Sequence, residues 1–154
     1  MRNKLSSVFF MWMAFAVGVI AVLAMFAPTM FNNDTGIESA SAYFWNYGDS
    51  IKGAWPAFVG YMLILAASLA SAVIALPFVQ PSAKVEKIVL ISSIVALGIG
   101  LVAVGLLQVE YSLMNSGNVG YTLNDLVYYP GWYITIVFGA IALAMDVIAV
   151  KLDW

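Results

Sequence analysis

Four long apolar stretches, separated by shorter polar segments, dominate the pattern of this chain of 154 residues. The stretches are Leu5–Ala27, Ala54–Leu76, Ile88–Val109 and Trp132–Val150. Each has about the ~20 residues that a helix needs to cross ~30 Å of hydrocarbon. The only charged residue inside them is Asp146. The pattern therefore predicts an all-α fold, a single integral membrane four-helix bundle that takes up the whole chain.

The positive charges predict how this bundle is oriented, because Lys and Arg favour cytoplasmic loops. One side of the predicted membrane carries Arg2, Lys4, Lys84, Lys87 and Lys151, and the other carries Lys52. Both termini and the turn between the second and third stretches are therefore expected in the cytoplasm of a bacterial-type cell. The first stretch exceeds the 7–15 apolar residues of a cleavable signal, which predicts a retained helix.

Composition supports the membrane assignment and narrows the chemistry. Hydrophobic residues make up 64% of the chain and charged residues 9%, against ~25% charged residues in soluble domains. A net charge of −2, with no Lys/Arg cluster, argues against nucleic-acid binding. Cysteine and histidine are absent, and the 8 acidic residues are scattered singly. We therefore expect no enzymatic activity, no cofactor and no metal site.

Small residues at helical spacing predict which helix faces pack, because close contact drives helix association in lipid. Stripes of this kind occur in the first three stretches. They consist of Ala14, Gly18 and Ala21; Gly60, Ala67, Ser71 and Ala75; and Ser92, Ala96, Gly100 and Ala103. These stripes pack the bundle on itself, or a stripe that lies outside forms a homo-oligomer interface.

The fourth stretch places Asp146 on a packing face, because Thr135, Gly139, Ala142 and Asp146 follow one another at helical spacing. Two interpretations remain open for Asp146. It is a structural residue that pairs with Lys4, Lys84 or Lys87 or bonds to a neighbouring helix. Alternatively, it is an ion or proton site in a transport path, with Thr135 or the pair Ser71 and Ser92 as polar neighbours.

Aromatic residues cluster in the two predicted external loops, Pro28–Gly53 and Glu110–Gly131, which we expect to pack together as a small aromatic cap. This cap is also the candidate external interaction surface, for a membrane or surface protein, a lipid or a cell-wall component. The alternative is that its rings pack inward and against lipid headgroups. The candidate residues are Tyr43, Phe44, Trp45, Tyr47, Tyr121, Tyr128 and Tyr129.

Four spans, both termini on one side and a longer first external loop containing Trp45 give the chain a layout that resembles claudin-like tetraspan proteins. Small bacterial membrane proteins of the same shape are the nearer match. The first loop lacks the Gly-Leu-Trp and the two cysteines of the claudin signature. Junction activity is therefore not implied by this resemblance.

These observations predict a non-enzymatic tetraspan protein that acts as an interaction module or as an accessory subunit of a membrane assembly. The alternative is a small transporter or channel subunit that uses Asp146. A lipid-processing enzyme is a third possibility, and it requires two or more acids to converge in one pocket.

Overall fold

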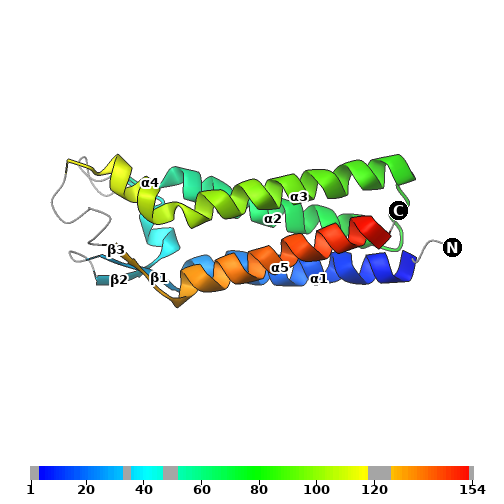
Figure 1. Ribbon diagram of the computed structural model, residues 1–154, viewed down its shortest axis with the longest axis horizontal. Helices are drawn as coiled ribbons and strands as arrows, with labels where there is room; N and C mark the ends of the chain where they lie inside the picture. Colours follow the sequence, from blue (N-terminus) through cyan, green and yellow to red (C-terminus); the bar gives the residue numbers. More distant parts are fainter. Residues whose placement is uncertain (1–3, 33–35, 47–51, 118–125, 153–154) are drawn as a thin grey trace.

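The computed structural model describes residues 4–32, 36–46, 52–117 and 126–152. Four long helices lie side by side, and α1 begins at the end of the bundle where α5 finishes (Figure 1). The helices are α1 (Lys4–Leu23), α2 (Trp55–Ala75), α3 (Ala83–Gly105) and α5 (Pro130–Leu152). All four are long and apolar enough to cross a membrane, as the hydropathy pattern predicted.

The helices form a closed square in which α1 packs against α2 and α5, and α3 packs against α2 and α5. Helices α2 and α5 therefore face each other across a diagonal. Two glycines bring α2 and α3 into backbone contact, since a Cβ at Gly60 would lie only 2.8 Å from the carbonyl oxygen of Gly100. Both glycines belong to stripes that the sequence predicted to pack.

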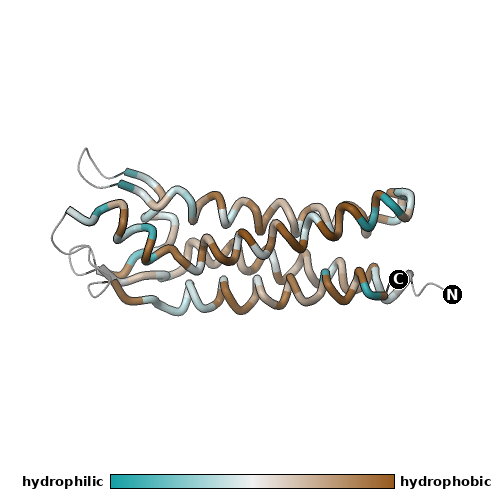
Figure 2. Tube along the Cα trace, turned by 45° about the horizontal axis from the view of Figure 1, so that its top comes forward, coloured by the Kyte–Doolittle hydropathy of each residue, from teal (hydrophilic) through white to brown (hydrophobic). Residues whose placement is uncertain are grey.

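The two ends of the bundle differ. At the turn end, residues 76–82 join α2 to α3, and Ser82 caps α3 by accepting from the amide of Val85 at 3.4 Å. Figure 2 shows that hydrophilic positions concentrate towards the two ends, whereas apolar residues dominate between them. This distribution matches a bilayer whose polar boundaries lie near the ends of the helices.

The opposite end, which we call the sheet end, departs from the predicted all-α fold. It holds a three-stranded antiparallel sheet of order β2-β1-β3, the 3-10 helices η1 and η2, and the short helix α4. Their bounds are β1 (Pro28–Asn32), β2 (Gly36–Ser39), β3 (Leu126–Tyr128), η1 (Ala24–Phe26), η2 (Ala40–Tyr43) and α4 (Leu107–Met114). Each strand is too short to show an alternating pattern in the sequence. These segments pair as a sheet because the backbone N–H and C=O groups outside the spans still need hydrogen-bond partners.

The third predicted span also needs correction. The helix begins at Ala83 rather than at Ile88 and ends at Gly105, and a new helix starts at Leu107. Leu106 has φ −92° and ψ 7°, which interrupts the α-helical path. Within the predicted stripe on this helix, Ser92 is misplaced, because it is exposed and the adjacent Ser93 is buried.

Candidate functional site

The inward face of α5 is the one that the sequence predicted. Thr135, Gly139, Ala142 and Asp146 are all buried. Asp146 has no exposed surface at all, although it is the one charged residue within the apolar stretches. A buried charge of this kind requires hydrogen-bond partners from its own protein.

Asp146 finds its partner across the diagonal of the bundle. The Ser71 hydroxyl of α2 lies 2.9 Å from Oδ1 and 3.0 Å from Oδ2, and it donates to the carboxylate. Among the side chains that the structure describes, Ser71 is the only hydrogen-bonding or ionic partner of Asp146. Lys84 and Lys87 are exposed, and the side chain of Lys4 lies outside the described residues. For a structural Asp146, we expected either an ion pair with a lysine or a hydrogen bond to a neighbouring helix. The structure contains the hydrogen bond.

Thr135 is not part of a common site with Asp146. The two residues are 11 positions apart on α5, which corresponds to ~16 Å along the helix axis. Thr135 instead joins three helices near the sheet end, where its Oγ1 lies 3.1 Å from the carbonyl oxygen of Ala21 and 3.2 Å from the Tyr61 hydroxyl. Its environment is that of an interhelical contact.

Three further serines line the interior of the bundle and were not singled out by the sequence. Ser7, Ser68 and Ser93 are buried, and Ser68 donates to the carbonyl oxygen of Ile64 at 2.7 Å. Within the described residues, the hydroxyl of Ser93 has no hydrogen-bond partner. Serine residues within the apolar helices were the available sequence signal for an inward face. Ser92 and Ser93 are adjacent, however, so only the rotation of the helix about its axis decides which of them faces inward.

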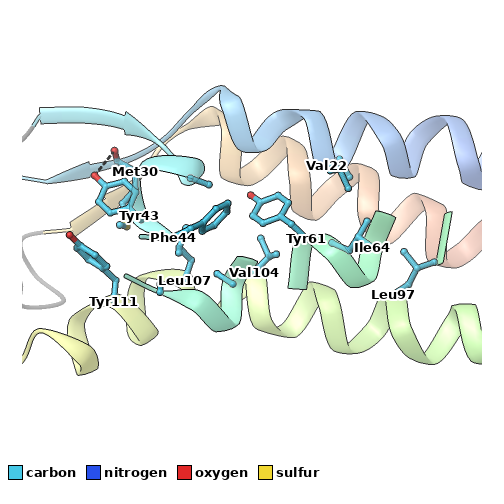
Figure 3. Packing of buried hydrophobic residues seen from close by; sticks show 14 of the residues in the cluster. Val22, Met30, Tyr43, Phe44, Tyr61, Ile64, Leu97, Val104, Leu107 and Tyr111 are labelled. Atoms are coloured by element: carbon cyan, nitrogen blue, oxygen red, sulfur yellow. Dashed lines mark hydrogen bonds between the residues drawn. The ribbon is translucent and has the colours of Figure 1, made fainter. Parts of the chain in front are cut away.

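The candidate external interaction surface is only partly a surface. Tyr43 and Phe44 are buried in the core, where the Tyr43 hydroxyl donates to the Met30 carbonyl oxygen at 3.4 Å (Figure 3). The Tyr43 ring also meets Tyr111 edge to face, at a centroid distance of 4.9 Å. For these two residues the prediction of an exposed interaction surface is wrong, because burial of the rings stabilises the sheet end against the bundle.

The remaining aromatic candidates have different environments. The Trp45 side chain is 65% exposed, and its ring packs at a tilt against the ring of Phe58. Tyr128 and Tyr129 are half-buried, whereas Tyr47 and Tyr121 lie outside the described residues. Trp45 is therefore the described member of the predicted surface that remains accessible to a partner.

Tyr128 secures the break between α3 and α4. Its hydroxyl donates to the Gly105 carbonyl oxygen and accepts from the Gln108 amide, each at 3.0 Å. Trp132 stacks on the Tyr128 ring at 4.0 Å and donates through its indole nitrogen to the Val104 carbonyl oxygen at 3.1 Å. These side chains replace helix hydrogen bonds that the break removes, as a broken helix near lipid requires. Burial raises the pKa of Tyr128, which keeps the donating proton on its hydroxyl.

Glu110 occupies an unexpected position at the same end. Helix α2 starts after Ala54, which supplies no side-chain cap, and the backbone amide of Ala57 in its first turn bonds to Glu110 instead. The second carboxylate oxygen, Oε2, is enclosed and has no hydrogen-bond partner among the described residues. Burial raises the pKa of Glu110, and the bond from Ala57 opposes this shift.

The sheet has one buried and one exposed face. Met30 and Leu126 are buried on the bundle side. Ile37 of β2 and Val127 of β3 both pair with Phe31 of β1, so they share one face, and each is 52% exposed. This cross-strand row of apolar residues lies outside the four spans.

Comparison of the chain with protein-family models, with curated proteins and with solved structures finds no significant match in any of the three.

Proposed function

We propose that this protein is a non-enzymatic membrane protein that acts as an interaction module or accessory subunit of a membrane assembly. The observation that carries the proposal is the exposed apolar row of Ile37 and Val127 on the outer face of the sheet. Isolated exposed apolar residues are ordinary, but two that share one face of a sheet outside the spans favour contact with a partner. The exposed ring of Trp45 adds a second apolar contact point at the same end.

The proposal includes an orientation. Lys84, Lys87 and Lys151 lie at the turn end, whereas Lys52 and Glu110 lie at the sheet end. This asymmetry supports a bacterial cytoplasmic membrane location with the turn end in the cytoplasm and the sheet end outside. The partner would then be a membrane or surface protein that presents an apolar surface on the external side.

The polar interior supports a role in assembly better than one in chemistry. Asp146 and Glu110 lie in opposite halves of the bundle, so they do not converge in one pocket as an acid pair would. Within the described residues, no group of three metal-ligating side chains comes together. The resemblance to claudin-like tetraspan proteins remains a prediction about layout.

Site-specific photo-crosslinking tests the interaction. A photoreactive residue placed at Val127 is expected to form a defined protein adduct in cells, and the matched control at Ala140, which is exposed on a membrane-spanning helix, is expected to form none. Ile37→Lys should abolish the adduct while leaving the melting temperature within a few degrees, because the side chain is half-exposed. Equal crosslinking at both positions, or an adduct insensitive to Ile37→Lys, would contradict the proposal.

The transport alternative rests on one observation, the placement of Asp146 within the bundle with a serine as its described partner. A carboxylate that lacks a fixed cation is the kind of group that binds an ion or proton in transporters. Asp146→Asn decides between the two functions. Loss of ion or proton flux in proteoliposomes with an unchanged melting temperature would support transport, whereas absence of flux in the wild-type protein would exclude it.

A further inference from the structure

A hollow of about 410 Å³ opens on the outward face of α3, away from the centre of the bundle. It is lined by Gly98, Ile99, Val102, Ala103, Leu106 and Glu110. Gly98 contributes to the hollow directly, because no atom lies within 4 Å of the position that a Cβ would occupy. Among the neighbouring side chains, Ile99 and Val102 are more than half exposed.

The polarity of this hollow changes along the membrane normal. From Gly98 to Leu106 its lining is apolar, and these residues belong to the third span or follow it directly. Glu110 follows the break at Leu106 and lies beyond the end of the span. An apolar hollow beside the outer part of the span, with one acid at its outer end, matches a single lipid standing in one leaflet.

Glu110 determines which headgroup fits. Its carboxylate group lines the outer end of the hollow and accepts a hydrogen bond from the Ala57 amide, while Oε2 is enclosed by protein atoms. A headgroup with positive charge and N–H donors would complement the negative charge that Glu110 places at this end of the hollow. An anionic headgroup would be repelled, and a trimethylated ammonium carries no N–H donor.

We propose that this hollow binds a phospholipid with a primary-ammonium headgroup, phosphatidylethanolamine, in the leaflet at the sheet end, with an acyl chain over Gly98 and the ammonium at Glu110. A second copy of the chain fits less well, because a parallel two-fold pair through this face would bring two Glu110 carboxylates together. The inference requires the bilayer placement of the bundle but not the proposed protein partner.

Lipid binding to the purified protein tests the inference. Native mass spectrometry would compare phosphatidylethanolamine, phosphatidylcholine and phosphatidylglycerol with identical acyl chains. We expect the wild-type protein to bind phosphatidylethanolamine about tenfold more tightly than the other two, the effect of one charge-assisted hydrogen bond. Equal binding of the three lipids would overturn the proposal.

Two variants test separately where the headgroup and the acyl chain of the lipid bind. Glu110→Gln keeps an acceptor for the Ala57 amide but removes the charge, so the preference for phosphatidylethanolamine should disappear. Gly98→Leu should fill the hollow and weaken binding of all three lipids, while Ala140→Leu on the exposed side of α5 should leave binding unchanged.

The outcomes remain separable. A preference that survives Glu110→Gln overturns the headgroup assignment, and a dimer that Gly98→Leu dissociates overturns the lipid in favour of a second copy. Because the preference is a ratio measured on one folded sample, reduced stability of a variant does not mimic its loss. Loss of lipid preference together with intact crosslinking at Val127 would refute this inference alone.

Discussion

The buried Asp146 and the half-buried Glu110 illustrate how differently one bundle treats the same functional group. Asp146 lies in the half of the bundle nearer the turn end, and the Ser71 hydroxyl reaches both of its oxygens. Glu110 lies at the sheet end, where the Ala57 amide bonds to one oxygen and Oε2 has no described partner. Each carboxylate therefore has one described donor, but the donor of Asp146 is a side chain in the interior of the bundle, whereas Glu110 also lines a hollow on the outward face of α3. This difference fits a structural role for Asp146 and the lipid-binding role that we propose for Glu110.

Lysine substitutions should give the largest contrast between the two acids. Asp146→Lys places a positive ammonium group in the bundle interior, and this group cannot accept the hydrogen bond from Ser71. The substitution should destabilise the protein by ~3 kcal/mol or more. Glu110→Lys should cost less, ~1 kcal/mol, because its half-buried position at the boundary lets the longer side chain reach water. Unfolding in mixed detergent–lipid micelles measures both. Equal losses would show that the depths of the two sites do not differ.

The aromatic clamp at the sheet end is expected to give the next largest effect. Tyr128→Phe keeps the ring stacked on Trp132 but removes the bonds to Gly105 and Gln108 at the helix break. The loss should be ~1–2 kcal/mol, since two backbone groups are left without partners. Tyr133→Phe is the matched control, because Tyr133 is 54% exposed. A similar loss in both variants would argue against a specific role for the clamp.

A double-mutant cycle measures the Asp146–Ser71 contact itself. Asp146→Ala, Ser71→Ala and the double variant should give a coupling energy of ~0.6–1 kcal/mol, the range found for interhelical hydrogen bonds in membranes. Asp146→Asn should retain most of the coupling, because its amide oxygen still accepts from Ser71. A coupling energy indistinguishable from zero would remove the argument that Asp146 is a structural contact.

The pH dependence of stability provides a smaller test at Glu110. Because burial raises its pKa, the folded protein binds the proton more tightly than the unfolded chain does. Stability from this proton is present below the ordinary value of 4.5 and is lost as pH rises through the higher folded-state pKa. The melting temperature of Glu110→Gln, relative to wild type, should therefore increase as pH rises from 4. A constant difference would indicate no shift at Glu110.

The same contrast shows what the sequence made predictable. Hydropathy predicted the four spans, and helical spacing placed Asp146 correctly beside Gly139 and Ala142, because one charge in an apolar helix must face protein. The choice of Ser92 over Ser93 was wrong, since α3 is apolar on all sides and gives no clear periodicity. The burial of Tyr43 and the exposure of Trp45 were equally hard to separate, because aromatic rings suit cores, headgroups and interfaces alike.

The break at Leu106 and the capping of α2 by Glu110 could not be read from local sequence. Both depend on contacts between segments far apart in the chain: Tyr128 with Gly105, and Glu110 with Ala57. The strands could not be predicted for a similar reason. Strand β3 has only 3 residues, and it pairs with β1, which belongs to the other predicted loop. Short elements of this kind are specified by tertiary pairing rather than by periodicity.

Thiol accessibility tests the central claim that the four helices cross a bilayer with the two ends in different compartments. The natural chain contains no cysteine, so Lys84→Cys and Val127→Cys each introduce a single thiol at an exposed position. In intact cells, a membrane-impermeant maleimide should label Val127→Cys, and it should label Lys84→Cys only after permeabilisation. Labelling of both thiols in intact cells would place the turn end and the sheet end in one compartment and contradict the account.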